Sequence, residues 1–165
     1  MNSDAVLDLL GWFVGSDDLR RAPTNESALL DLGWVEVREN DVAGWKEWRR
    51  GIESGYSNAF EDVRAFEVVV KILWPGEGAN FGLLYELFEA EYVRLVTLVE
   101  ERVGASTYSS EFDEPPVPMP GQFDRATVWR SGRGTVAVSF QHEDKEAPLR
   151  MSLWLLTGDG ATRVD

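Results

Sequence analysis

The segment that most constrains the fold is the long amphipathic stretch from residue 80 to residue 103. At 100° per residue its apolar side chains fall within one half of a helix: Leu84, Leu87, Phe88, Tyr92, Leu95, Leu98, Val99 and Val103. Glu86, Glu89 and Glu100 fall on the other half, and Arg94 is close enough to Glu91 to pair with it. The pattern predicts a helix that lies on the protein with an acidic outer face.

Three segments with strand periodicity follow, at residues 126–130, 135–141 and 149–156, and turns at 131–134 and 142–148 join them. Apolar and polar side chains alternate in the last two segments, so we expect one face to be core and the other to be nearly polar. Trp154 alternates with Leu153 and Leu155 and therefore belongs to the polar face. It is either an exposed anchor or covered by the N-terminal segment.

The first half of the chain adds shorter elements. Helices are expected from a cap at Ser3 to Gly15 and after Pro23, with Thr24 or Asn25 as N-cap of the second. Strands are expected at residues 35–37 and, well buried, at 66–74. Residues 40–60 stay unassigned, because two Trp at helical spacing compete with three Gly.

These elements predict an α+β fold in which an antiparallel sheet of about 4–6 strands packs against one long helix, with short N-terminal helices. The length favours one domain over residues 1–165. Four prolines between residues 115 and 120 predict that residues 104–122 form an exposed, extended connection.

The charge of the chain excludes several classes of partner. Asp and Glu number 29 against 16 Lys and Arg, a net charge of −13. Residues 80–124 hold nine acids and two basic residues and contribute −7 of this charge. Such a surface repels nucleic acid and anionic lipid. No apolar run is long enough to span a membrane, and Asp4 and Asp8 interrupt any signal peptide, so a cytoplasmic location is expected.

The residue inventory and two local motifs argue against an enzyme. There is no Cys and one His, so we expect no metal of the zinc type and no cofactor. The glycines of residues 74–82 lack the spacing and the Lys of a phosphate-binding loop, which favours a turn and helix cap. Residues 142–146 place His142 beside carboxylates, but consecutive side chains on a turn rarely converge, which favours a solvated acidic turn over a general base.

The chain resembles a class of small acidic bacterial proteins. The resemblance rests on residues 28–34 (Ala-Leu-Leu-Asp-Leu-Gly-Trp), the central strand and long helix, Val128-Trp129-Arg130 and the terminal hairpin around residues 142–146. These proteins are similar to the immunity proteins encoded beside secreted polymorphic toxins. The resemblance implies a cytoplasmic inhibitor, not an enzyme, and it carries over no binding residue.

The favoured hypothesis is therefore an immunity-type inhibitor that blocks a cognate toxin enzyme, a basic protein partner, through an acidic surface. The candidate partner-binding residues are Glu111, Asp113, Glu114, Glu143, Asp144, Glu146 and Trp154. The alternative is a non-catalytic binding module, or a secretion-chaperone-like protein, whose sheet face around Trp154 holds a client segment. The oligomeric state stays open.

Overall fold

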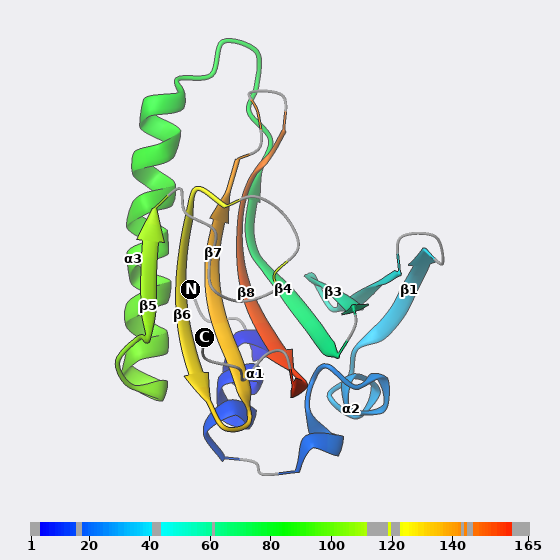
Figure 1. The fold of residues 1–165 in the computed structure, drawn as a ribbon. Helices are drawn as coiled ribbons and strands as arrows, with labels where there is room; N and C mark the ends of the chain where they lie inside the picture. Colours follow the sequence, from blue (N-terminus) through cyan, green and yellow to red (C-terminus); the bar gives the residue numbers. More distant parts are fainter. Residues whose placement is uncertain are drawn as a thin grey trace.

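One eight-stranded antiparallel sheet and one long helix dominate the molecule. The structure is a computed structural model, and it describes residues 4–15, 18–40, 44–60, 62–111, 119, 123–142, 144 and 147–159. The strands are β1 (Val35–Asn40), β2 (Trp45–Arg50), β3 (Glu53–Phe60), β4 (Val63–Leu73), β5 (Tyr108–Glu111), β6 (Arg125–Ser131), β7 (Gly134–Gln141) and β8 (Leu149–Thr157). The helical elements are α1 (Asp4–Gly15), a short 3₁₀ turn (Leu19–Arg21), α2 (Glu26–Asp31) and α3 (Phe81–Val103). The order across the sheet is β1-β2-β3-β4-β8-β7-β6-β5 (Figure 1). The predicted α+β class is confirmed, and the predicted number of strands is too low.

The strands that sequence periodicity missed are β2, β3 and β5. β2 and β3 form a hairpin in which Arg50 pairs with Glu53, and Gly51 supplies the positive φ of 60° that the tight turn requires. β5 lies within the segment expected to be an extended connection, and its Tyr108 pairs with Val128 of β6. All three strands are held by their ladders more than by an apolar pattern of their own.

Helices α1 and α3 cover one face of the sheet, as Figure 1 shows from the opposite side. Phe88, Tyr92, Leu95 and Val99 of α3 are buried in the main core with side chains from the central strands. Asn80 caps α3 by accepting a hydrogen bond from the Leu83 amide at 3.3 Å. The predicted helix is confirmed, and so are its exposed outer glutamates and the Glu91–Arg94 pair, at 3.3 Å.

The second face of the sheet is also buried where β7 and β8 lie, which corrects the expectation of a nearly polar face. Every residue of β7 is buried, and so is every residue of β8 except Arg150. A second core cluster on this face contains Val128, Ala137, Trp154 and Leu156, with Phe123 packed against it. Small and apolar residues at the supposedly outward positions make this second layer possible.

The N-terminal elements follow the sequence prediction closely. Asn25 caps α2 and accepts a hydrogen bond from the Ser27 amide at 3.1 Å. α1 ends at Gly15 and buries the expected apolar side, including Leu9 and Phe13. The predicted cap of α1, Ser3, lies outside the described residues.

Candidate functional site

The acidic residues proposed for partner binding come from two segments of which the structure describes little. Glu111 is the last residue of β5, and Asp144 is exposed in the β7–β8 connection. The other four proposed acids, Asp113, Glu114, Glu143 and Glu146, lie outside the described residues. Of Glu111 and Asp144, only Asp144 has a described side chain. A binding surface shared by the six acids therefore stays a prediction.

Trp154 is covered, which decides between the two positions that the sequence left open. Its side chain is 5% exposed, and the indole N–H donates to the Ser139 hydroxyl at 2.8 Å. Phe123 packs edge-on against the ring with centroids 6.3 Å apart. The second alternative named the N-terminal segment as the cover, but the described residues of α1 pack in the core cluster on the other face of the sheet. Trp154 is therefore a core residue and not an exposed anchor.

A buried ion pair lies next to Trp154. Glu67 of β4 is 4% exposed, pairs across the ladder with Trp154, and accepts a hydrogen bond from Arg150 Nη2 at 2.5 Å. The Ser152 hydroxyl donates to the other carboxylate oxygen. Burial raises the pKa of Glu67 above its ordinary value, although the Arg150 charge and both hydrogen bonds act in the opposite direction. An ion pair at this depth is costly to bury and marks a candidate site.

This ion pair forms part of the floor of a pocket of about 620 Å³, called here the Arg38 pocket. It is lined by Arg38, Trp45, Glu47, Tyr56, Asn58, Glu67, Gln141, Ala147, Pro148, Arg150 and Trp154. Cross-strand pairing brings Trp45, Tyr56, Glu67 and Trp154 to one face, because directly paired residues of an antiparallel ladder share a face. Figure 1 shows β1 and β3 set to one side of β4 and β8.

Each of two arginines in the Arg38 pocket lies over an aromatic ring. The Arg38 guanidinium carbon is 5.7 Å from the centre of the Trp45 ring, and that of Arg150 is 5.0 Å from the centre of Tyr56. The Trp45 and Tyr56 rings meet edge to face at 5.9 Å. The result is a wall built from two aromatic rings, each with a guanidinium group over it.

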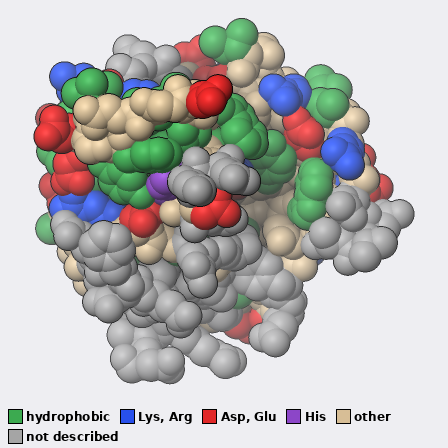
Figure 2. Space-filling view, turned by 90° about the horizontal axis from the view of Figure 1, so that it is seen from above, with side chains coloured by type: hydrophobic (Ala, Val, Ile, Leu, Met, Phe, Trp, Pro, Cys, Tyr) green, Lys and Arg blue, Asp and Glu red, His purple; other side chains and the backbone are tan. Residues whose placement is uncertain are grey.

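A different surface lies at the end of the molecule where β4 leads into α3. Trp74 is 67% exposed, and Leu73, Leu83 and Leu87 are 36%, 52% and 52% exposed. Figure 2 views this end and shows hydrophobic side chains gathered around the chain's one histidine, His142. We call Leu73, Trp74, Leu83 and Leu87 the apolar end. Its exposure corrects two expectations, a strand buried through residue 74 and an inward Leu87.

His142, the first residue of the predicted acidic turn, packs against the start of α3. Its Nδ1 is 2.7 Å from the Tyr85 hydroxyl, and its ring stacks on Phe81 with centroids 5.4 Å apart. Burial raises the pKa of Asp124, while a hydrogen bond from the His142 main chain acts against this rise. A carboxylate close to His142 is thus supplied by Asp124, directly before β6.

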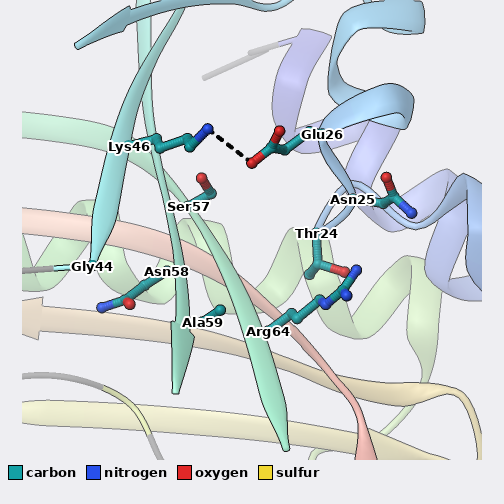
Figure 3. Close-up of a pocket in the computed structure, with 9 residues that line it drawn as sticks. All are labelled: Thr24, Asn25, Glu26, Gly44, Lys46, Ser57, Asn58, Ala59 and Arg64. Atoms are coloured by element: carbon teal, nitrogen blue, oxygen red, sulfur yellow. Dashed lines mark ion pairs between the residues drawn. The ribbon is translucent and has the colours of Figure 1, made fainter. Parts of the chain in front are cut away.

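A smaller pocket of about 350 Å³ opens between the start of α2 and strands β2 to β4. Figure 3 shows Lys46 pointing to Glu26, with Thr24, Ser57 and Arg64 around the opening. The Lys46 ammonium lies 3.0 Å from Glu26, and it also pairs with Glu36 and Glu39. These three carboxylates raise the pKa of Lys46, the Glu26 hydrogen bond most of all. Its charge is thus already matched within the fold.

Two general findings apply to the described part of the chain. No three His, Cys, Asp or Glu side chains there are grouped as a metal site would require. No helix within it is long and apolar enough to cross a membrane.

Sequence reasoning missed both the Arg38 pocket and the apolar end. The available signal for the pocket was Glu67, an acid within an otherwise apolar strand. For the apolar end it was the position of Trp74 directly before Pro75 and Gly76, where a strand gives way to a link. Neither signal reveals whether other segments of the chain cover the side chain in question.

Comparisons with protein-family models, with curated proteins and with solved structures find no match to this chain.

Proposed function

We propose that this protein is a non-catalytic protein-binding domain and that its partner is a basic polypeptide. The observation that carries the proposal is Trp74, an aromatic side chain 67% exposed at the end of the molecule where Leu73, Leu83 and Leu87 are also exposed. Exposed apolar patches of this kind mark interaction surfaces, and Trp is enriched among the residues that dominate binding energy. Glu77 and Glu86 are exposed near the same end.

The net charge of −13 supports a basic partner. Charge attraction steers association, while desolvation of apolar side chains sets how long a complex lasts. Within this class we favour an immunity-type inhibitor acting in the cytoplasm on a cognate toxin enzyme. Enzymes that act on phosphates carry Lys and Arg in their active sites, and a carboxylate surface matches that charge.

The proposed roles of individual residues change with the burial of Trp154. Trp74 takes the place of Trp154 as the proposed anchor, since it is the more exposed of the two. The steering residues proposed from the sequence are retained: Glu111, Asp113, Glu114, Glu143, Asp144 and Glu146. We expect the steering residues to affect the rate of association and the anchor to affect the rate of dissociation.

The test uses the product of the reading frame next to this gene, purified as a basic toxin domain if one is encoded there. Reversing the six acids to Lys should slow association and flatten its dependence on salt. Trp74→Ala should leave association nearly unchanged and speed dissociation by about tenfold or more. Ile52→Ala is the matched control, because Ile52 is 98% exposed at the far β2–β3 turn.

A neutral or acidic neighbouring product, or binding that survives all of these changes, contradicts the inhibitor proposal.

The apolar end also favours a second candidate, a secretion-chaperone-like module that holds an apolar client segment. Salt distinguishes the two, because a client held by apolar contacts stays bound as ionic strength rises. In that case Trp74→Ala still weakens binding, whereas the six reversals do not.

A further inference from the structure

We propose that the Arg38 pocket binds a carboxylate carried on a flat, apolar group. This site is separate from the apolar end, and the proposal does not depend on the protein-binding function. The pocket's volume of about 620 Å³ falls within the range of sites that enclose small ligands or single side chains. Its lining combines aromatic rings with a few charged groups, as such sites do.

The first step of the argument concerns the acceptors in the pocket, which are already in use. Both oxygens of Glu67 accept hydrogen bonds, one from Arg150 and one from Ser152. Glu47 accepts from the Nε and Nη2 atoms of Arg49 at 3.0 and 2.7 Å. The two carboxylates that line the pocket are therefore neutralised by cations of the fold, and a cationic ligand finds no free acid in them.

The second step concerns the donors, which exceed these acceptors. Arg38 is exposed, and among the described residues its guanidinium contacts the Trp45 ring but no carboxylate. The Nε–H of Arg150 is buried and has no hydrogen-bond partner in the described structure. Guanidinium groups carry five N–H donors and pair with carboxylates in a planar, bidentate manner. Among the described residues, the Arg38 guanidinium and the Arg150 Nε–H thus have no anionic acceptor.

Lys46 of β2, the strand that pairs with β1 and so with the strand of Arg38, provides an internal comparison. It faces the other side of the sheet and is held by three carboxylates. The cation beside the smaller pocket is thus paired with carboxylates of the fold, whereas Arg38 has no carboxylate partner within the described part of the chain. This difference points to Arg38 as the residue that a ligand carboxylate would contact.

The walls of the pocket indicate what the carboxylate is attached to. The Trp45 and Tyr56 rings form one side, and Pro148 and Trp154 contribute further apolar surface. The indole N–H of Trp154 is already bonded to Ser139, so this ring offers the ligand only apolar surface. A flat apolar group would remove these surfaces from water while its carboxylate reached Arg38.

Titrations of the full chain with matched probes test the proposal, with the indole N–H signals of ¹⁵N-Trp followed by NMR. One arm uses benzoate against its neutral counterpart benzamide. The other uses the peptide Ala-Ala-Phe with a free carboxylate against the same peptide amidated. We expect at least one carboxylate to shift the Trp45 signal, which Trp45→Phe identifies, and its neutral counterpart to bind at least tenfold more weakly.

Arg38→Gln should weaken binding of the active carboxylate by about tenfold or more. Arg94→Gln is the matched control, because Arg94 is a 72% exposed arginine on α3 and should leave binding unchanged. Benzoate binding without peptide binding assigns the site to small carboxylates, and the reverse assigns it to chain ends. Equal binding of the amides, no effect of Arg38→Gln, or no shift of Trp45 at millimolar concentrations of both carboxylates overturns the proposal.

Discussion

At the scale of single residues, Trp74 is exposed where the strand pattern predicts burial, and Trp154, whose exposure the pattern left open, is buried. Trp154 is 5% exposed and Trp74 is 67% exposed. Trp154→Ala should lower the free energy of unfolding by about 3–5 kcal/mol, because it leaves a cavity and an unpaired Ser139 hydroxyl. Trp74→Ala should change it by less than about 0.5 kcal/mol. Urea denaturation measures both, and a large loss in the Trp74 variant would show that this ring is packed.

Glu67 is a second residue whose surroundings predict a measurable effect, in this case on pH dependence. Burial raises the folded-state pKa of this carboxyl above its ordinary value of 4.5, so the folded chain binds this proton more readily than the unfolded chain. Over the pH range between the two values, this group therefore adds stability as pH falls and removes it as pH rises.

Comparison with Glu67→Gln isolates this contribution from other titrating groups. We expect the free energy of unfolding of the native chain to increase relative to that of the variant as pH is lowered through the raised pKa toward the ordinary value of 4.5. The midpoint of the difference curve lies above 4.5. A difference that does not vary with pH, or that grows as pH rises, would contradict a raised pKa and indicate that Arg150 outweighs burial.

At the scale of elements, α3 is the part of the fold that the sequence predicts best, and its cap can be tested. Asn80 accepts a hydrogen bond from the Leu83 amide at the first turn. Asn80→Ala should cost about 1 kcal/mol of unfolding free energy, whereas Asn80→Asp should cost little because Asp is an equally good cap. Thermal or urea unfolding of both variants checks this, and equal losses would mean that the cap is not what stabilises this turn.

The elements that the sequence did not predict have identifiable physical causes. Gly55 argued against regular structure, yet it lies within β3. A glycine is required there because the Phe66 ring occupies the space that a side chain would take. A Cβ on Gly55 would lie 2.6 Å from Phe66 Cζ. Glycine here marks a close approach between strands and not a turn, and only the pairing of β3 with β4 reveals it.

Exposure was harder to predict than element type, because a period gives the direction of a side chain but not what covers it. Leu87 lies at the margin of the apolar half of α3 and is 52% exposed. Ala137 and Trp154 belong to the face expected to be polar, and Phe123, from outside the strands, packs against the cluster they form. The Arg38 pocket was out of reach for the same reason, since it depends on register across several strands.

At the scale of the whole molecule, the net charge of −13 acts on stability as well as on partners. Like charges repel in the compact state, and salt screens this repulsion. The exposed glutamates Glu100 and Glu101 lie in the last turn of α3, where the helix dipole favours cations over anions. Reversing both should therefore relieve two unfavourable interactions together.

Each reversal removes one negative and adds one positive charge, so Glu100→Lys with Glu101→Lys changes the net charge from −13 to −9. We expect the double variant to be more stable by about 0.5–1 kcal/mol at low salt, because both dipole and net-charge terms improve. The gain should shrink as NaCl rises from about 20 mM to about 300 mM, where screening has already weakened the repulsion. Replacing both residues by Asp is the control, since it keeps the charge and should leave the salt dependence unchanged. An increase in stability that persists in full at high salt would trace the effect to helix propensity or packing, and the acid excess would then have no measurable cost to the fold.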